Sequence, residues 1–524
     1  MQRLLLSLVV SLCLCGTRLH ADESGFKPIF DGQTLAGWDG NTNFWRVEDG
    51  AITGQTTPES PTKGNTFIVW RAGELDDFEL RLEYRIVGGN SGVQYRSWED
   101  EAAWGKWVIG GYQADLEAGD TWSGALYGER FRGILAARGE KTVIGADHKR
   151  QTVGTVGDSA ELQKGIRKED WNEYVIRAEG YHFVHTINEK VTIDSTDEDT
   201  ERRRRTGLLA LQLHAGPPMK VQFRNIRLKR LPLADRKKVV FIAGKKSHGY
   251  FAHEHNAGSI LLANALNESG LDVLATVYRN HLPENDWVFI EDKPNGVFPW
   301  PRDPTAFDNA DALVFYNDGG GRHPANQHLE EIDALMKKGV GLACLHYGVE
   351  VPKGASGDRF LDWIGGYFET YLSVNPHWIL QARRAELAAG HPITRGVEPF
   401  TVDDEWYYNM RLASHQDGMT PILRAVPPAH TRERRFGPHS GNPHVRARRG
   451  MYETVAWCRE RSDGGRGFGF TGGHNHENWG HDGFRKLVLN ALLWVARGEV
   501  PNAGVPSRSL TREDLEANQD YPKR

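Results

Sequence analysis

Apolar and polar residues alternate along several short segments in the N-terminal part of the chain. In residues 78–86 almost every second residue is apolar, which is the period of a strand with one buried face. Residues 174–178 and 181–187 flank a glycine and predict two neighbouring strands, and residues 207–213 and 221–228 predict two more. Since no long helical period interrupts these segments, we predict a two-sheet sandwich of antiparallel strands.

The pattern changes near residue 238. Residues 238–244 form a largely apolar run, which is typical of a parallel strand buried on both faces. Helices are predicted over residues 255–267 and 326–338, strands over 271–278, 312–316, 341–346 and 467–471, and an apolar closing helix over 484–497. This alternation of strands and helices predicts a doubly wound, flavodoxin-like α/β domain.

A chain of 524 residues exceeds what one hydrophobic core usually serves, which agrees with two domains. We expect the β-sandwich over residues 26–231, a short polar linker over 232–237 and the α/β domain over 238–500. Residues 501–524 are polar and contain three prolines, which favours a tail on the surface.

Residues 1–21 have the pattern of a secretory signal peptide. Arg3 precedes an apolar run over residues 4–14, and the segment ends in a small residue, Ala21. The run is too short to span a bilayer, and no later stretch approaches the ~20 apolar residues of a spanning helix. Cys15 leaves a lipoprotein anchor as an alternative, but Leu14 is bulky where lipid-attachment signals prefer a small residue. We therefore expect secretion or release into the periplasm.

Composition narrows the classes of partner and cofactor. After the signal peptide only Cys344 and Cys458 remain, too few for a disulfide framework or a cysteine-rich metal site. The formal net charge is −5, and the basic run 202–205 directly follows the acidic run 197–201, which argues against a nucleic-acid partner. Nothing in the sequence indicates a nucleotide cofactor or fixes the oligomeric state.

Histidines gather in the α/β part, where 16 of the 21 follow Arg236. Several lie just after a predicted strand, at the end of the sheet where doubly wound domains form their sites. These candidates are His248, His255, His346, His474 and His476. Imidazole suits both metal binding and proton transfer near neutral pH. Two interpretations stay open: ordinary hydrogen-bonded loop residues, or a convergent site for a divalent metal ion or for acid/base groups.

The same segments carry a family resemblance. From residue 238 to 498 the chain resembles the ThuA-like (trehalose-utilisation) family, a relative of the class I glutamine amidotransferase fold. The matching pieces are residues 248–256, 319–321, 341–346, 404–407 and 472–474. The resemblance implies a doubly wound domain with a site at the carboxyl ends of its strands.

The chain departs from the amidotransferase pattern at the position of the nucleophile. Amidotransferases carry a nucleophilic cysteine at the turn after a strand, and His346 stands at that turn here. Cys344 lies two residues earlier, and we interpret it as a core residue. His474 falls where that fold carries its catalytic histidine, and His476 where its orienting acid would stand. The resemblance therefore implies a metal or proton-transfer site, with Glu405 as its carboxylate partner or, alternatively, a surface acid in a turn.

Residues 26–231 resemble the 3-keto-disaccharide hydrolase-like domain, which is built on a concanavalin or laminin-G type sandwich. The matching pieces are residues 30–38, 45–50, 90–96, 171–172 and 223–226. Many relatives carry a glutamate after a Gly-Tyr pair. In this chain Gln113 stands there, and the acid is Asp115, two residues later.

Alternation along neighbouring strands predicts a polar site on one concave face of the sandwich. Asp115 and Glu129 are the candidate catalytic residues, with salt bridges to arginines as their alternative role. Arg96 is the expected electrostatic partner. The predicted substrate-binding residues are Gln94, Arg96, Gln113, Tyr127 and Arg132. Four nearby tryptophans, Trp98, Trp104, Trp107 and Trp122, either stack on sugar rings or fill the core.

The resemblance implies a chemistry that depends on a ketone. A ketone at C3 of a sugar acidifies the proton on C2, a base removes that proton, the C1–O bond breaks, and water adds afterwards. A two-carboxylate glycosidase is less favoured, because no independent pair of acids is marked. We expect an exported protein that cleaves 3-keto-glycosides, with the ThuA-like domain in the same keto-sugar pathway. The alternative is a carbohydrate-binding sandwich that tethers a ThuA-like catalytic or metal-binding domain to polysaccharide.

Overall fold

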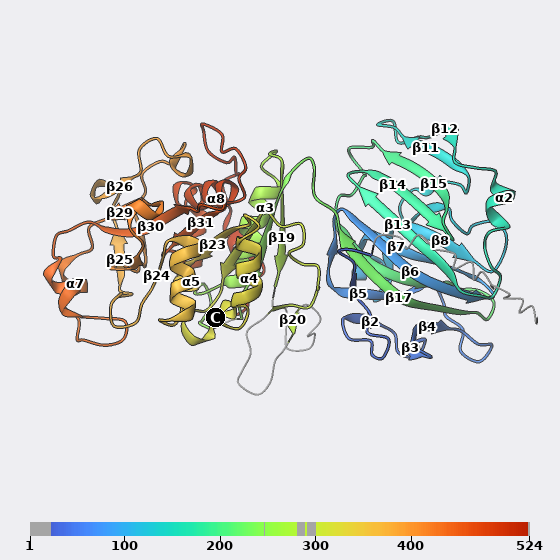
Figure 1. The fold of residues 1–524 in the computed structure, drawn as a ribbon, viewed down its shortest axis with the longest axis horizontal. Helices are drawn as coiled ribbons and strands as arrows, with labels where there is room; N and C mark the ends of the chain where they lie inside the picture. The colour runs from blue at the N-terminus through green and yellow to red at the C-terminus, as the bar shows by residue number, and fades with distance from the viewer. Residues whose placement is uncertain (1–22, 246, 280–288, 291–299, 522–524) are drawn as a thin grey trace, which may run out of the picture.

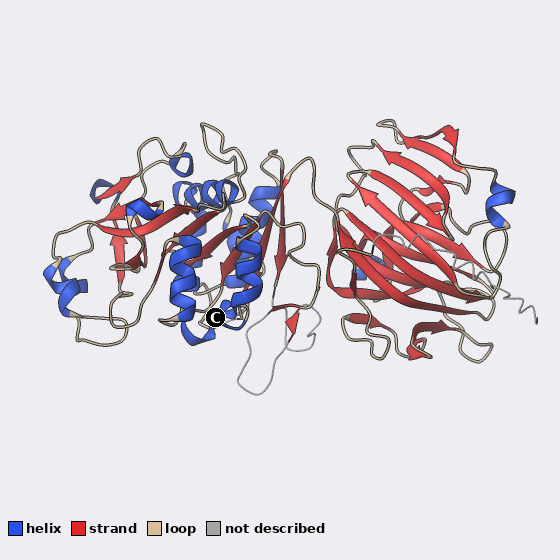
Figure 2. Cartoon of the chain, viewed as in Figure 1, coloured by secondary structure: helices blue, strands red, loops and turns tan. Residues whose placement is uncertain are grey.

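A computed structural model describes residues 23–245, 247–279, 289–290 and 300–521 of the chain. The expected signal peptide, residues 1–21, lies outside the described residues. The chain forms an N-terminal body made almost entirely of strands and a C-terminal body of strands and helices (Figures 1 and 2). The two predicted fold classes, a β-sandwich followed by an α/β domain, are confirmed.

The N-terminal body consists of two sheets. The first has the order β12 (Arg150–Thr155), β11 (Glu140–Ile144), β15 (Lys190–Asp197), β14 (His182–Ile187), β13 (Asn172–Glu179), β6 (Phe78–Val87), β17 (Lys220–Arg230), β4 (Ala51–Gln55) and β3 (Trp45–Glu48), with β1 (Lys27–Pro28) paired to β17. The second has the order β10 (Gly133–Ala136), β9 (Leu126–Glu129), β8 (Ile109–Glu117), β7 (Asn90–Glu99), β16 (Gly207–Leu213), β5 (Thr66–Leu75) and β2 (Trp38–Gly40). Two short helices, α1 (Glu101–Trp104) and α2 (Ser159–Gln163), connect strands.

The sandwich core follows directly from the alternation in the sequence. Along β6, buried side chains such as Leu80, Leu82 and Tyr84 alternate with partly exposed ones. These side chains pack against the inner face of the second sheet in one continuous hydrophobic cluster. β13 and β14 pair antiparallel around the predicted turn, so the expected meander is present. Burial of the two inner faces is the main source of stability for such a sandwich.

The C-terminal body is built on an eight-stranded sheet. Its order is β19 (Val273–Tyr278), β18 (Lys237–Ala243), β22 (Ala312–Tyr316), β23 (Gly341–Leu345), β31 (Arg466–Phe470), β30 (Glu453–Glu460), β29 (Met419–Ala425) and β26 (Ala385–Leu387). The first five strands are parallel, as predicted. The last three are antiparallel and extend the sheet beyond the strands expected from the sequence.

Helices cover both faces of this sheet (Figures 1 and 2). α3 (His255–Asn267) and α8 (Asp482–Val495) bury their apolar sides in one hydrophobic cluster, and α4 (Leu329–Met336) and α5 (Ala355–Ile364) bury theirs in another. α4 is shorter than the predicted helix over residues 326–338. His328 has non-helical backbone angles, and its ring stacks on Trp300 at 3.8 Å, so a separate 3-10 turn precedes the helix.

Smaller elements surround the sheet. Three two-stranded ribbons pair β20 (Phe289–Ile290) with β21 (Trp300–Pro301), β24 (Gly366–Tyr367) with β28 (Arg411–Leu412), and β25 (His377–Leu380) with β27 (Val402–Glu405). The remaining short helices are α6 (Ala429–Arg432), α7 (Pro443–Ala447) and α9 (Arg512–Glu516). In the C-terminal tail, Leu515 is buried and the backbone amide of Asp520 donates to Glu254, so the described part of the tail lies on the α/β domain. Within the described ranges, no helix is both long and apolar enough to cross a bilayer.

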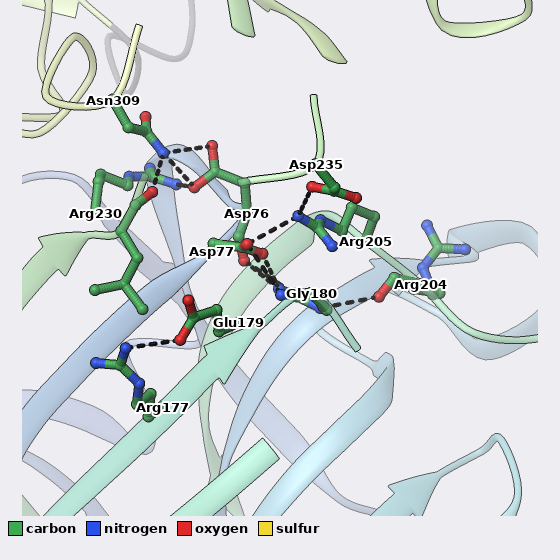
Figure 3. Close-up of polar contacts among 12 residues, drawn as sticks. Asp76, Asp77, Arg177, Glu179, Gly180, Arg204, Arg205, Arg230, Asp235 and Asn309 are labelled. Carbon is green, nitrogen blue, oxygen red and sulfur yellow. Dashed lines mark hydrogen bonds and ion pairs between the residues drawn. The ribbon is translucent and has the colours of Figure 1, made fainter. Parts of the chain in front are cut away.

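A buried ion network joins the two bodies (Figure 3). Asp76, just after β5, accepts hydrogen bonds from Arg230 of β17 at 3.0 Å and from Lys238 of β18 at 2.5 Å. Arg230 also pairs with Asp303 of the α/β domain at 2.8 Å. The side chains of Asp76, Arg230 and Lys238 are at most 2% exposed. Burial by itself would raise the pKa of Asp76, but the two cations lower it far below its usual value. The network therefore connects side chains of the two domains at a buried position.

Candidate functional site

A pocket of about 620 Å³ opens in the sandwich at the strands where the sequence predicted a polar site. β8 contributes side chains at every second position, namely Gln113, Asp115 and Glu117, so all three face the same side. β9 pairs with β8 and adds Tyr127 and Glu129. The rim is completed by Asn65, Gly89, Asn90, Trp122 and the loop of residues 214–217 with Met219.

Asp115 is the most perturbed acid of this pocket. Its side chain is buried, and its carboxylate accepts one hydrogen bond, from the Gln113 amide at 2.6 Å. Burial raises the pKa of Asp115 to about 8, and the nearby carboxylates of Glu129 and Glu117 add to the rise, while the hydrogen bond from Gln113 opposes it. A carboxyl group with this pKa can both accept and return a proton near neutral pH.

Side-chain amides hold the other polar groups of the pocket. Glu129 accepts from the amides of Asn65 at 3.3 Å and Gln212 at 3.4 Å. Gln94 is fully buried behind the pocket and donates to Gln113 at 2.8 Å, so it positions Gln113 rather than lining the cavity. Burial raises the pKa of Tyr127, and the neighbouring carboxylates add to that rise, so its hydroxyl remains a hydrogen-bond donor at neutral pH.

Arg96 does not line the pocket, contrary to the expectation from strand alternation. The register of β7 shifts between Tyr95 and Trp98, and Arg96 has a left-handed backbone with φ 47°. A bulge of this kind redirects the side chain. The guanidinium is fully buried and donates to the Asp77 carboxylate at 2.8 Å and to the Gly180 carbonyl at 2.6 Å.

Arg132 also lies away from the pocket. In the turn between β9 and β10, its guanidinium donates to Asp197 and, at 3.1 Å, to Asp199. Both of these carboxylates are fully buried and require a cation, which explains where the arginine points. Arg132 therefore serves as the counter-ion of two buried carboxylates in the sandwich.

One of the four tryptophans, Trp122, lines the pocket, and its side chain is 38% exposed. Trp98 and Trp104 pack on each other with ring centroids 6.0 Å apart. Trp107 donates through its indole N–H to Asp39 at 2.9 Å. An exposed aromatic face at a pocket rim is suited to stacking on a sugar ring.

A second candidate site lies at the carboxyl ends of the parallel strands of the α/β domain. His253, His346, Glu405 and His474 each offer one ligand atom, and these four atoms lie within 4.8 Å of one another. We call these four residues the histidine cluster. His346 follows β23, His474 follows β31, Glu405 ends β27 and His253 precedes α3. The position agrees with the general rule for sites in doubly wound sheets.

His346 is locked in one tautomer. Its backbone is left-handed, with φ 51°, which is the sharp turn expected after the strand. Its Nδ1 lies 2.9 Å from the Thr471 carbonyl oxygen, which can only accept, so Nδ1 carries the proton and Nε2 presents a lone pair. That Nε2 is 3.0 Å from His253 Nε2 and 3.6 Å from the Glu405 carboxylate. His474 Nδ1 lies 3.0 Å from His253 Nε2, so the ring nitrogens converge on one point.

Burial keeps the imidazoles of His346 and His253 neutral. It lowers the pKa of His346 and of His253 well below the usual range, and the crowding of further imidazoles adds to both effects. Burial opposes ionisation of Glu405, but His474 and His346 outweigh it and lower the pKa of this carboxyl. Three imidazoles and one carboxylate form a donor set that fits a divalent transition metal such as Zn²⁺.

The structure brings some of the predicted histidines together and separates others. His346 and His474 lie in the cluster with Glu405. His248 and His255 lie next to it around Asp318, with the His248 ring 3.7 Å from that of His253. His476 is set apart, because it is buried against Phe251 at 5.6 Å and is not one of the grouped side chains.

Sequence reasoning missed His253, which lies at the centre of the cluster. It is not the residue that directly follows a strand, and it adopts a left-handed backbone with φ 52° inside an irregular loop. The usable signal was the close spacing of His248, His253 and His255, which brings three imidazoles into a single loop and helix start. Cys344, two residues before His346, is fully buried, and its position agrees with the expected core role.

Two family models match the chain. Residues 25–229 match the 3-keto-alpha-glucoside-1,2-lyase-like domain, and residues 301–495 match the trehalose utilisation (ThuA) family. Both resemblances expected from the sequence are therefore confirmed. A 3-keto-disaccharide hydrolase from Bacteroides thetaiotaomicron is 33% identical over 90 residues, which are 16% of this chain and 31% of that protein. The chain thus spans about a third of the length of this relative.

Solved structures are similar to each part of the chain. A ThuA-like protein from Parabacteroides merdae is 14% identical and covers 54% of this chain and 99% of its own length, with a TM-score of 0.34. The carbohydrate-binding module CBM66 from Bacillus subtilis is 16% identical and covers 37% of this chain and 96% of its own length, with a TM-score of 0.25.

Proposed function

We propose that this chain, which joins a 3-keto-α-glucoside-1,2-lyase-like domain to a ThuA domain, cleaves 3-keto-glycosides in its sandwich pocket. The observation that carries the proposal is Asp115, a buried acid with a pKa of about 8 in a polar cavity large enough for a sugar. The signal-peptide pattern of residues 1–21 supports action outside the cytoplasm.

The proposed reaction is an elimination followed by hydration. The Asp115 carboxylate removes the proton from C2 of the 3-keto sugar, and the electron pair of that bond forms an enolate with the C3 ketone. Reformation of the ketone expels the aglycone oxygen from C1, and this oxygen takes up a proton. Water then adds to C1 and releases one proton to solvent, which balances the solvent proton that the aglycone oxygen took up. Asp115 returns its proton to C2, so the net reaction is hydrolysis.

The remaining polar groups of the pocket have supporting roles in this proposal. The Tyr127 hydroxyl and the second N–H of the Asn65 amide are donors that an enolate oxygen can use. Gln113 already holds Asp115 through its 2.6 Å hydrogen bond, so it fixes the direction of the base. Trp122 at the rim supplies an aromatic face for the sugar or the aglycone.

The raised pKa of Asp115 predicts a specific pH profile. The base must be ionised, so kcat/KM for aglycone release should rise about tenfold per pH unit below pH 8 and level off above it. The measurement is release of a chromogenic aglycone from a 3-keto-glucoside between pH 5.5 and 9.5. A profile that is flat from pH 5.5 to 8 would show that a group with an ordinary carboxyl pKa, or no base at all, limits the reaction.

We further propose that the histidine cluster holds a divalent metal ion and that this site acts on a keto sugar. When bound, such an ion polarises a carbonyl or hydroxyl oxygen as a Lewis acid. The residues of the chain would hold it through Nε2 of His346 and His253, Nδ1 of His474 and the Glu405 carboxylate. The Tyr407 hydroxyl, 3.2 Å from His346 Nε2, is placed to donate to a substrate oxygen beside the ion.

Replacement of Glu405 tests the metal proposal. Glu405→Gln removes the only anionic ligand of the cluster and should lower the affinity for Zn²⁺ by at least ~10–100-fold. The measurement is a titration of metal-depleted full-length protein, with Asp403→Asn as the control, because Asp403 lies on the same strand with its side chain exposed. Equal affinities in wild type and Glu405→Gln would exclude Glu405 as a ligand.

The exposed ring of Trp122 favours one alternative function, a carbohydrate-binding module that only tethers the α/β domain. This alternative predicts that the protein binds oligosaccharides and that no aglycone is released from any glycoside. Binding that Trp122→Ala weakens, together with an absence of turnover, would favour the module over the enzyme.

A further inference from the structure

A second group of metal-binding side chains lies directly beside the histidine cluster. His248, His253 and Asp318 each offer a ligand atom, and these atoms lie within 4.8 Å of one another. His255 approaches the same carboxylate, with Nε2 3.9 Å from Asp318 Oδ1. None of these residues except His253 belongs to the histidine cluster.

The tautomer of His255 leaves an unused lone pair in this group. His255 Nδ1 lies 3.0 Å from the Lys245 carbonyl oxygen, which can only accept, so Nδ1 carries the proton. The ring is fully buried, and its Nε2 has no hydrogen-bond partner among the described residues. The buried lone pair of His255 Nε2 therefore faces Asp318 Oδ1. A cation between these two electron-rich atoms would stabilise both of them.

A hydrogen-bond relay orients His248 in the same way. The Ser247 hydroxyl donates to Asp318 Oδ1 at 2.6 Å, so its oxygen is left to accept from His248 Nδ1 at 2.9 Å. His248 Nδ1 therefore carries the proton, and Nε2 presents a lone pair. His248 lies at the exposed edge of the group, where a ligand from solvent can complete the coordination.

We propose that His248, His255 and Asp318 form a second divalent-cation site adjacent to the histidine cluster. The 3.9 Å between His255 Nε2 and Asp318 Oδ1 fits an ion held between them, since zinc lies about 2.0–2.2 Å from nitrogen and oxygen ligands. Two imidazoles and a carboxylate are the donor set of known three-residue zinc sites that leave one position open.

Asp318 links the two sites. His253 Nδ1 lies 3.3 Å from Asp318 Oδ1, and an N–H donated there leaves His253 Nε2 free for the histidine cluster. Asp318 would therefore be a ligand of the second ion and a positioning residue for the first. This inference rests on the proposed use of the histidine cluster as a metal site only through His253.

The stoichiometry of metal binding tests the second site. Metal-depleted full-length protein is titrated with Zn²⁺, and bound metal is counted by mass spectrometry of the elements. Wild type should bind two equivalents per chain, and His255→Gln one. Asp318→Asn should bind one equivalent, with the affinity of that equivalent lowered about tenfold because His253 loses its orienting carboxylate. Asp403→Asn is the matched control and should bind two.

The two metal proposals fail in different ways. Suppose that the wild type saturates at one equivalent, and that this equivalent binds more weakly in Glu405→Gln but is kept in Asp318→Asn and His255→Gln. This result overturns the second site and supports the first. A wild type that binds no ion overturns both. Circular dichroism of each variant verifies the fold, and the wild-type stoichiometry decides the question even if one variant does not fold.

Discussion

Asp115→Asn should lower kcat/KM for aglycone release from a 3-keto-glucoside by about 10²–10⁴-fold, the usual contribution of a positioned general base. The amide keeps the shape of the side chain and its contact with Gln113, but it cannot accept the proton of C2. Asp147→Asn is the control, because Asp147 is an exposed carboxylate outside the pocket. Full activity of Asp115→Asn would exclude this residue as the base.

The stability of the same variant separates a catalytic role from a structural one. The pKa of Asp115 is raised in the folded state, so ionisation above the unfolded value costs folding free energy, and stability should fall as pH rises toward about 8. Asp115→Asn removes that cost and should be at least as stable as wild type at pH 9. Lower activity with equal or higher Tm is the expected pair of results. A large loss of Tm would instead mean that Asp115 holds the sandwich together.

Asp76→Ala should destabilise the protein by about 3–5 kcal/mol, because it leaves Lys238 without its buried counter-ion and removes one partner of Arg230. The matched control is Asp308→Ala. Asp308 pairs with Lys27 across the same domain boundary, but both side chains are partly exposed, so the expected cost is about 0–1 kcal/mol. The measurement is denaturant unfolding of the full chain, followed by probes in each domain.

The pH dependence of this stability has a definite sign. The pKa of Asp76 is lowered in the folded state, so its contribution is present above the unfolded value near 3.8 and is lost as pH falls toward the folded value. The difference in the free energy of unfolding between wild type and Asp76→Ala should therefore decrease only at acidic pH. Equal effects of the two substitutions at neutral pH would contradict a role for the buried network in joining the domains.

The fold was predictable wherever burial imposes a simple period. Residues 78–86 alternate because one face of β6 is buried, and residues 238–244 are largely apolar because β18 is covered on both faces. The antiparallel strands at the far edge of the sheet in the α/β domain were not predictable in this way. β29 contains Pro421, and its register shifts after that residue, so neither composition nor alternation marks it as a strand.

The candidate sites were predictable to a similar extent. Regular alternation on β8 and β9 correctly grouped Asp115, Glu129, Gln113 and Tyr127 on one face. The bulge at Arg96 breaks that alternation, and no residue type at this point of the sequence indicates a bulge. In the α/β domain, long-range packing of four separate segments decides which histidines converge. Strand ends alone could therefore not indicate His253.

The central claim is that the pocket around Asp115 acts on sugars whose C2 proton is acidified by a C3 ketone. The most direct test uses purified protein that spans residues 22–524. It compares release of the same chromogenic aglycone from a 3-keto-glucoside and from the ordinary glucoside. Release from the 3-keto-glucoside alone is the predicted result, because the ordinary glucoside has no proton that a carboxylate can remove from C2. Comparable release from both substrates would contradict elimination and point to direct glycoside hydrolysis.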